Sequence, residues 1–489
     1  MTESATAPRH LVWLWAALGL AGSALVAVAA PHAVDDRVVG WWYVPGAMTG
    51  RGSSLALVYV GMAALSCAWL GLGRALPSRR GLLIVAAAWA LPLALAPPLF
   101  SRDVYSYLAQ GTILRLGHNP YHTAPAALAG LGHPHMLAAV SEFWRHTTAP
   151  YGPLFLGLVA LITAVVGSHL VAGVLLIRAL GLIGAVLLAI YVPRLARSLG
   201  TDPRRALWLG LLSPLVMLEL IAGGHNDLLM AGLLAAGVAY ALDGRPMLGI
   251  AICALAATVK VPALAGVAFI AVAWGREERG RGAPARFLAG AALITVVVLG
   301  AVTLVTGVGV DWLSTALFST PAKVRLAITP ATGLGYTLAS LLSDVGIAVS
   351  HRGLEGVLGV IGFVLVAMAG VVLLARVRIG RLVASLGAFL LIAAAGGPAA
   401  WPWYFIWGLA LVCALRFAQR SLALALAIAV SAFAVKPNGI LALPLQSAPA
   451  VMAAYLVIAV AVWWARRRRR AAVRPAAVRE RTPSALAGT

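Results

Sequence analysis

Long apolar segments, separated by short polar links, make up most of this chain. The segments approach 20 residues and show no period-two alternation, which is typical of transmembrane α-helices and not of β-barrel strands. They predict an all-α, polytopic integral membrane protein with about 12–15 transmembrane helices. The predicted apolar segments are Leu11–Ala30, Ser53–Gly73, Gly81–Phe100, Leu154–Gly167, Leu170–Tyr191, Ala206–Ala222, Leu228–Leu242, Leu248–Val259, Ala263–Trp274, Phe287–Gly307, Gly353–Ala375, Leu382–Ala395, Ile406–Leu415, Leu422–Val435 and Met452–Trp464.

The composition supports this prediction. Of the 489 residues, 62% are hydrophobic and 11% are charged, whereas soluble proteins carry about 25% charged residues. We expect one multi-pass domain over residues 1–464 and a basic tail over residues 465–489. The cysteines Cys67, Cys253 and Cys413 lie far apart in apolar segments, so we interpret them as packing residues.

The net charge of +22 indicates membrane lipids as partners and not nucleic acid, because the arginines gather in short links. This is the pattern of cytoplasmic loops under the positive-inside rule. It predicts a plasma-membrane protein with both termini cytoplasmic and its tail on anionic lipid. The segment Leu154–Gly167 breaks the alternation, so we predict that it inserts only halfway. The basic links are residues 74–80, 194–205, 276–286, 376–381, 416–420 and 466–470.

The longest polar interruption is a predicted outer loop over residues 99–153. Its part Ser101–Leu116 predicts an amphipathic helix at the membrane surface, with Asp103 in the first turn. A carboxylate at the edge of a bilayer is costly and tends to be functional. We therefore predict that Asp103 is a general base for a hydroxyl nucleophile. The alternative is a carboxylate that only stabilises the helix N-terminus.

A second acidic motif, GGHND at residues 223–227, follows another apolar segment. Its glycines let the backbone approach a ligand closely, and we predict that His225, Asn226 and Asp227 bind substrate. Two ligands do not make a metal site, so a divalent metal stays an open alternative and no other cofactor is expected. The structural alternative is a turn between helices in which Asn226 or Asp227 is the N-cap.

Lysine and arginine together number 37, but only three of these residues are lysines. All three lysines fall on the predicted outer face. Lys436, in a short loop, is interpreted as a solvated cation. Arg178 lies inside a predicted span, and Glu219 is the nearest type of partner for it. The cations that we predict to hold an anionic leaving group are Arg102, Lys260, Lys323 and Arg325.

Aromatic residues gather near the predicted outer end of a late segment, at Trp401, Trp403 and Tyr404. They favour an aromatic belt at the membrane interface. The alternative is a surface on which a sugar ring stacks. We keep Trp403, Tyr404 and Tyr105 as candidates for substrate binding.

Five motifs occur in an order that resembles one enzyme family. The motifs are SRDVYSYLAQG at 101–111, GHNPY at 117–121, APYGP at 149–153, GGHND at 223–227 and KVPAL at 260–264. Together they resemble the bacterial polyprenol-phosphate-mannose-dependent α-1,6-mannosyltransferases, which are actinobacterial membrane enzymes of the GT-C superfamily. No single motif decides this, but their order extends over most of the chain.

The resemblance implies a GT-C bundle with its active site on the outer face. It implies a polyprenyl-phosphate-mannose donor, a lipid-linked mannan acceptor and inverting transfer in lipomannan and lipoarabinomannan synthesis. Asp103 matches the catalytic acidic position of the superfamily, and Asp227 matches the second. One departure is that two predicted spans precede the span of the loop, whereas many GT-C enzymes place the loop directly after their first span.

Three rival interpretations remain at this level. Another GT-C transferase would move arabinofuranose or modify proteins, and the sequence separates this possibility only weakly. A transporter or flippase predicts inverted repeats and charges at the bilayer midplane, and no repeat is visible. A purely structural subunit is the third interpretation.

Overall fold

The computed structural model describes residues 9–34, 41, 50–315, 329–397 and 399–457. The helices of the first half are α1 (Arg9–Val34), α2 (Arg51–Ala75), α3 (Arg79–Leu95), α4 (Asp103–Arg115), η1 (Pro125–Ala129), α5 (Pro134–Ala139), α6 (Glu142–Arg145), α7 (Pro153–Val166), α8 (Leu170–Ser198), α9 (Pro203–Gly210), η2 (Leu215–Ala222) and α10 (Asp227–Leu242). Those of the second half are α11 (Pro246–Ala257), η3 (Val261–Ala263), α12 (Leu264–Gly275), α13 (Ala283–Thr306), α14 (Trp312–Ser314), α16 (Pro330–Asp344), α17 (His351–Ala375), η5 (Ile379–Arg381), α18 (Leu382–Gly396), η6 (Pro402–Phe405), α19 (Ile406–Val412), α20 (Arg416–Arg420), α21 (Leu422–Ser431) and η7 (Leu445–Ser447).

The predicted all-α polytopic fold is confirmed. Six described helices are long and apolar enough to cross a membrane, and the bent pair α9 and η2, at 47°, adds a seventh if it forms one span. Shorter apolar helices of 10–17 residues lie among them. Several of the predicted segments are therefore too short to cross a bilayer unaided. The six long helices are α1, α2, α8, α13, α17 and the stretch Ile379–Gly396.

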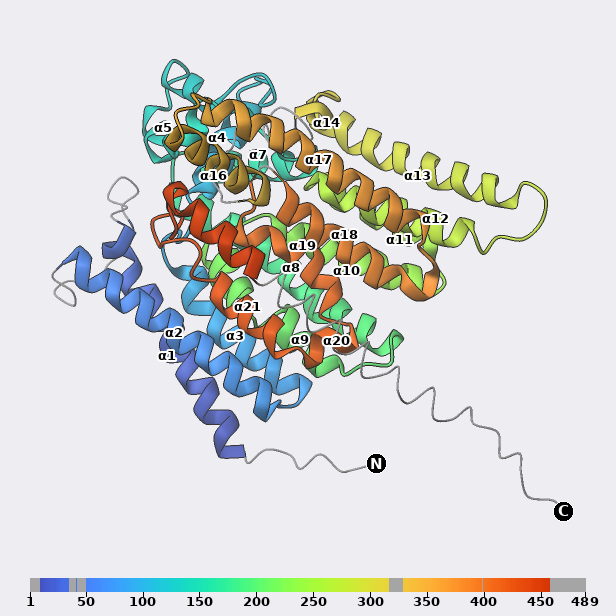
Figure 1. The fold of residues 1–489 in the computed structure, drawn as a ribbon, viewed down its shortest axis with the longest axis horizontal. Coiled ribbons are helices and arrows are strands. Elements are labelled where there is room, and N and C mark those ends of the chain that lie inside the picture. The colour runs from blue at the N-terminus through green and yellow to red at the C-terminus, as the bar shows by residue number, and fades with distance from the viewer. Residues whose placement is uncertain (1–8, 35–40, 42–49, 316–328, 398, 458–489) are drawn as a thin grey trace.

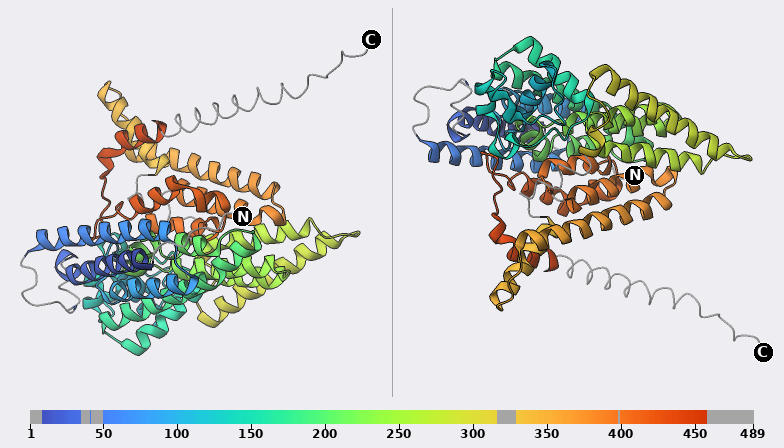
Figure 2. Two further views of the ribbon diagram at one scale, coloured as in Figure 1. Left: turned by 90° about the horizontal axis from the view of Figure 1, so that it is seen from below. Right: turned by 90° about the horizontal axis from the view of Figure 1, so that it is seen from above.

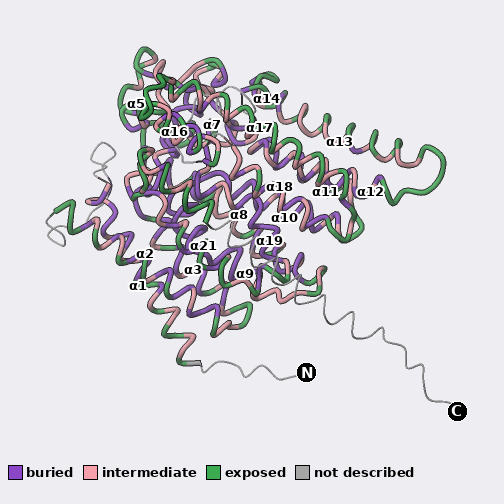
Figure 3. The backbone as a smooth tube through the Cα atoms, viewed as in Figure 1, coloured by how far each residue is buried: buried purple, intermediate pink, exposed green. Residues whose placement is uncertain are grey.

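The helices at the periphery carry apolar side chains outward. None of the most apolar stretch of α17 and only 11% of that of α13 is buried. On α13, Leu304 and Val305 are 83% and 87% exposed. Figure 2 shows α17 along one outer face of the molecule, and Figure 3 shows its exposed surface. These helices need lipid around them, because so much exposed apolar surface is unfavourable in water.

The centre of the bundle is built on close contacts between helices α8 and α10. Almost every residue of α10 is buried. A Cβ atom at Gly184 would lie 2.2 Å from the carbonyl oxygen of Leu228, and one at Gly232 would lie 2.5 Å from that of Gly184. Small residues let membrane helices approach at backbone distance. The two glycines therefore set the position of α10, whose first residue is Asp227.

The predicted surface helix at Ser101–Leu116 forms as α4, but its predicted exposure is wrong. Residues Asp103 to Ile113 are all buried, on the polar side as well as the apolar side. The rest of the loop explains this, because η1 and α5 pack against α4 together with α7 and α8, and Trp144 of α6 contacts Asp103. Figure 1 shows α4, α5 and α7 together at one end of the bundle. Because α4 is buried, its polar side chains belong to an enclosed cluster and do not lie at the membrane surface.

The predicted half-inserted segment Leu154–Gly167 corresponds to α7, which has 14 residues. At 1.5 Å per residue it spans about 21 Å, less than the about 30 Å of a hydrocarbon core. It ends at Gly167, which has a φ of 58°, a conformation that favours glycine. The helix is therefore short for a full crossing, and its partial insertion stays a prediction from the charge pattern.

Candidate active site

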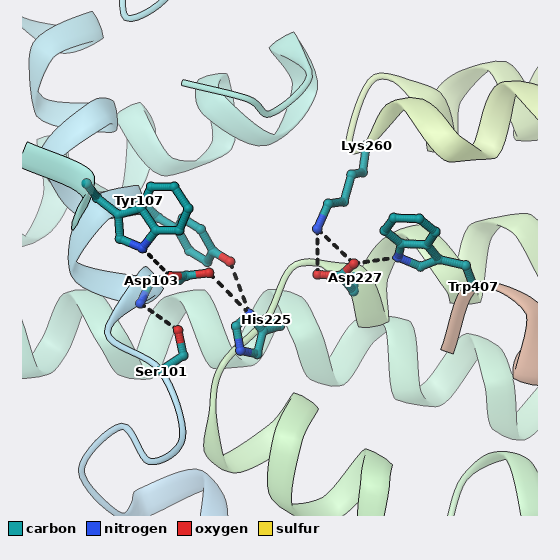
Figure 4. Close-up of polar contacts among 8 residues, drawn as sticks. Ser101, Asp103, Tyr107, His225, Asp227, Lys260 and Trp407 are labelled. Carbon is teal, nitrogen blue, oxygen red and sulfur yellow. Dashed lines mark hydrogen bonds and ion pairs between the residues drawn. The ribbon is translucent and has the colours of Figure 1, made fainter. Parts of the chain in front are cut away.

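Asp103 is the first residue of α4 and sits in a nearly closed environment. Its side chain is 11% exposed, and its Oδ1 accepts a hydrogen bond from the indole nitrogen of Trp144 at 2.8 Å. Its backbone N–H donates to Ser101 Oγ at 3.0 Å, which holds the start of the helix in place (Figure 4). Burial is the main cause that raises the pKa of Asp103 to about 6, against the opposing effects of Ser101, Lys260 and Trp144.

His225 joins α4 to the GGHND segment. Its Nδ1 lies 3.6 Å from Oδ2 of Asp103 and 3.5 Å from the hydroxyl of Tyr107. Burial, and then the charge of Lys260, hold the pKa of His225 well below its usual range. The ring stacks on Trp403 at a centroid distance of 3.9 Å. His225 therefore connects the predicted base to an aromatic surface.

Asp227 and Lys260 form the second half of the cluster. The ammonium of Lys260 lies 2.8 Å from both carboxylate oxygens of Asp227. Trp407 donates its indole N–H to the same carboxylate at 2.5 Å, as Figure 4 shows. The side chain of Asp227 is fully buried and that of Lys260 is 12% exposed. A lysine has three donors, so this geometry leaves donor capacity on Lys260 for an anionic group.

Aromatic rings enclose Lys260 and continue to His225. The ammonium lies 4.6 Å from the ring centre of Tyr404, 5.6 Å from that of Trp407 and 5.9 Å from that of Tyr151. Tyr404 packs edge-on against Trp403 at 6.1 Å. Cation–π contacts stabilise a charge at a desolvated position. These aromatic rings thus connect the Lys260–Asp227 pair with His225, which lies beside Asp103.

Arg178 on α8 holds the two acidic segments together. Its guanidinium, 2% exposed, donates to the carbonyl oxygens of Ala94, Ala96 and Pro97 and to that of Ala222. The first three precede Asp103, and the last precedes GGHND. Glu219, the nearest type of partner in the sequence, does not pair with Arg178, because both Glu219 oxygens are buried without a hydrogen-bond partner in the described part of the chain.

Backbone hydrogen bonds join the end of the APYGP motif to the residues just before KVPAL. Gly152 N–H donates to Val259 O at 3.0 Å, and the N–H of Leu154, directly after the motif, donates to Thr258 O at 3.0 Å. A Cβ atom at Gly152 would lie 2.2 Å from the Thr258 carbonyl oxygen, so only glycine permits this approach. The contact places the outer loop against the turn that carries Lys260.

The structure brings together most of the residues that the sequence predicts for the site. The residues in one contiguous cluster are Asp103, His225, Asp227, Lys260, Trp403 and Tyr404. Lys323 and Arg325 lie outside the described residues. Lys436 is exposed, in agreement with its interpretation as a solvated cation.

Arg102, Tyr105 and Asn226 adjoin the cluster in different ways. Arg102 donates to the Ala139 carbonyl oxygen at 2.9 and 3.1 Å, and Tyr105 accepts from the indole of Trp41 at 3.0 Å. Asn226 occupies the N-cap position of α10 but makes no side-chain cap hydrogen bond. Asn226 is therefore the N-cap residue of α10, as the structural alternative expects, but its side chain does not cap the helix.

Three tryptophan and tyrosine contacts were not predicted from the sequence. Trp144 and Trp407 donate to the two carboxylates, and Tyr107 contacts His225. Tyr151, which lies beside Lys260, belongs to the motif APYGP, so the sequence did draw attention to its segment. No local pattern identifies Trp144 or Trp407, because each reaches its carboxylate across a large sequence separation.

The cluster has few of the side chains that bind a divalent metal. Asp103 and His225 are close to each other, but over the described ranges no group of three or more His, Cys, Asp and Glu side chains gathers. Protein sites for metals use at least three such ligands, or several oxygen ligands. Over the described residues, the side chains of the cluster do not fit the ligand set of a resident metal.

Comparisons with known proteins agree with these motifs. The family model described as "Alpha-(1->6)-mannopyranosyltransferase, N-terminal domain" matches residues 14–276. Alpha-(1->6)-mannopyranosyltransferase A of Mycobacterium tuberculosis is 37% identical over 83% of this chain and 81% of its own length. The protein of the same name from Corynebacterium glutamicum is 35% identical over 54% of this chain and 59% of its own length. No solved structure matches. The chain therefore belongs to the alpha-(1->6)-mannopyranosyltransferase family of membrane glycosyltransferases.

Proposed function

We propose that this chain transfers mannose from a polyprenyl-phosphate-mannose donor to a hydroxyl of a lipid-linked mannan, and that it forms an α-1,6 linkage with inversion. The observation that carries the proposal is the nearly buried carboxylate of Asp103, beside His225 and within one cluster with Asp227 and Lys260. Membership of the mannosyltransferase family supports the sugar. The surrounding apolar helices suit a donor with a polyprenyl tail.

The reaction is one displacement. The 6-hydroxyl of the acceptor attacks the anomeric carbon of mannose, and Asp103 accepts the hydroxyl proton. The bond between that carbon and the phosphate oxygen breaks, and its electron pair leaves on the polyprenyl phosphate. That leaving group is stable as an anion and needs no general acid. A cation at the phosphate stabilises the growing charge, and the free donor capacity of Lys260 supplies it.

Unpaired polar groups support substrate binding next to Asp103. His225 Nε2 and both amide atoms of Asn226 are buried, with no hydrogen-bond partner within the residues that the structure describes. Leaving such groups unpaired costs free energy. Hydroxyl groups of bound mannose would pair with them. In this proposal Trp403 and Tyr404 contact the sugar through their ring edges, because the ring of Trp403 is already stacked on His225 and Trp401, and that of Tyr404 on Trp407.

We also propose that the cluster faces the outside and that both termini are cytoplasmic. The basic links support this orientation. Arg74, Arg205, Arg416 and Arg420 come from three links and line one cavity, at the end of the bundle away from α4 (Figure 1). Basic loops are retained on the cytoplasmic side. Residues 1–464 then form the single catalytic domain proposed above, while the tail at 465–489 lies outside the described residues.

The test is transfer of label from mannosyl-phospho-polyprenol to a short α-1,6-mannoside in membranes. We expect Asp103→Asn to lower the transfer rate by about 10²–10⁴-fold, because general base catalysis is lost. The control is Asp344→Asn, an exposed aspartate at the end of α16, which should match the parent. Normal transfer by Asp103→Asn would remove Asp103 as the base. No transfer by the folded parent would reject the donor and point to another sugar.

A further inference from the structure

A cavity of about 670 Å³ opens at the end of the bundle away from Asp103. It lies among α2, α9, α20 and α21 and the short links beside them. Figure 1 draws α4 near the top of the molecule and α9 and α20 near the bottom. Four arginines line the cavity against one aspartate; they are Arg74, Arg205, Arg416 and Arg420, and the aspartate is Asp202.

The aspartate does not neutralise these arginines, because it is already engaged. Asp202 caps α9 by accepting from the Arg204 N–H at 2.8 Å, and it pairs with the Arg204 guanidinium at 3.3 Å. Across the described ranges, no carboxylate pairs with Arg74, Arg205 or Arg420. The cavity therefore keeps a strongly positive lining.

Helix geometry adds to this charge. Ser421 lines the cavity and is the N-cap of the ten-residue helix α21, whose N-terminus carries a partial positive charge. The base of the cavity is fixed by Gln419, which is 6% exposed. Its amide donates to Asp202 O at 2.9 Å and to Cys413 O at 3.2 Å. The lining is a built structure, held by buried hydrogen bonds.

One side of the lining is apolar. Leu70, Trp208, Leu422 and Ala425 contribute to it. Trp208 stacks on Trp69 at 4.7 Å, and each indole N–H donates to the backbone carbonyl oxygen of the other residue. A ligand with an anionic head and an apolar part suits such a lining, because arginine forms strong paired hydrogen bonds with phosphate.

We propose that this cavity binds phosphate groups, supplied either by the head group of an anionic phospholipid or by a soluble phosphate compound. Basic pockets between transmembrane helices at the cytoplasmic side bind phospholipid head groups of this kind. The site is separate from the Asp103 cluster, and the proposal does not depend on the reaction proposed there. Binding of an anion here would hold α2, α9 and α20 together.

The experiment uses the purified full chain in two arms. In the first, nanodiscs of phosphatidylcholine with increasing cardiolipin are analysed by native mass spectrometry for bound cardiolipin. In the second, inorganic diphosphate is titrated calorimetrically into the detergent-solubilised chain. Each arginine near an anionic surface contributes about fivefold in affinity. We therefore expect Arg205→Gln with Arg420→Gln to weaken binding by about 30-fold.

The matched control is Arg197→Gln, an exposed arginine at the end of α8 that does not line the cavity. It should bind as the parent does. Loss in the cardiolipin arm alone assigns the site to lipid, and loss in the diphosphate arm alone assigns it to a soluble phosphate compound. Equal binding by the double variant and the control in both arms overturns the proposal. If the double variant unfolds at a lower temperature, the two single variants are compared, each with about fivefold loss expected.

Discussion

Burial gives Asp103 a property that an exposed aspartate lacks. Its pKa of about 6 follows from desolvation, which outweighs hydrogen bonds from Ser101 and Trp144 and the charge of Lys260. A base works best when its pKa lies near the working pH. The carboxylate is therefore basic enough to accept a proton and still ionised near neutral pH. The raised pKa of Asp103 therefore depends on the loop that buries α4.

The pH dependence of transfer tests this balance. In the proposed reaction Asp103 can accept a proton only when it is ionised, so the rate should fall as the pH drops below about 6. Well below the pKa the expected slope is about tenfold per pH unit. Initial rates of mannosyl transfer across about pH 4.5 to 8 provide the measurement. The residual transfer by Asp103→Asn should lack the inflection, and the same inflection in that variant would assign it to another group.

The proposed function gives the Lys260–Asp227 pair a role in transfer that can be separated from its structural role. Lys260→Met leaves the buried Asp227 carboxylate without its ion-pair partner, which we expect to destabilise the protein by about 3–5 kcal/mol. Adding Asp227→Leu should recover most of that stability, because a buried pair can be replaced by apolar groups. Transfer should stay low in both variants, since no ammonium remains for the phosphate.

Thermal unfolding in detergent and mannosyl transfer are the two readouts for this pair. The parent chain is the reference for both. Recovery of transfer together with stability in the double variant would show that the pair is only structural.

At the scale of elements, one guanidinium joins three parts of the chain. Arg178 on α8 satisfies carbonyl oxygens in the last turn of α3, directly after α3 and at the end of η2. The backbone bond from Leu99 N–H to Ala222 O, at 3.4 Å, runs between the same segments. Carbonyl groups at irregular helix ends need such donors inside a membrane protein. Arg178 therefore sets the spacing between Asp103 and His225.

We expect Arg178→Lys to lower the rate of transfer by about tenfold, because a lysine cannot reach all four carbonyl oxygens and a small displacement of catalytic groups is costly. The substitution keeps the charge, so the effect reports geometry. Arg197→Lys, on the exposed end of the same helix, is the control. A transfer rate equal to that of the parent would show that the carbonyl contacts do not position the site.

At the scale of the whole molecule, the site depends on how closely α8 and α10 approach. Gly184 touches the backbone of Leu228, next to Asp227, and no side chain can be placed between them. In contrast, the apolar outer faces of α13 and α17 face lipid and make few contacts with other helices. The precise packing is concentrated where the acidic residues are held.

Gly184→Val tests this dependence. The added side chain pushes α10 away from α8, which should lower the unfolding temperature and the rate of transfer together. Gly181→Val is the matched control one turn earlier on α8, where an added Cβ meets nothing within 4 Å. Unfolding followed by circular dichroism and transfer in the same preparation are the measurements. Equal effects of both substitutions would reject a specific role for the glycine contact.

The sequence by itself determined the membrane class and the identity of the acidic residues. Apolar runs near the thickness of a bilayer leave few alternatives to helices, because backbone groups must be paired in lipid. Asp103, Asp227 and Lys260 were recognisable because polar residues are rare in such a chain. The order of the motifs around them indicated the family.

Only the tertiary structure decided how these residues meet. The pairing of Lys260 with Asp227, and of Trp144 and Trp407 with the two carboxylates, joins residues 33 to 180 positions apart. The exposure of α4 was predicted wrongly for the same reason: periodicity records polar and apolar sides, but which of them is covered depends on loops and helices elsewhere. Contacts over such separations follow from packing, and no local pattern encodes them.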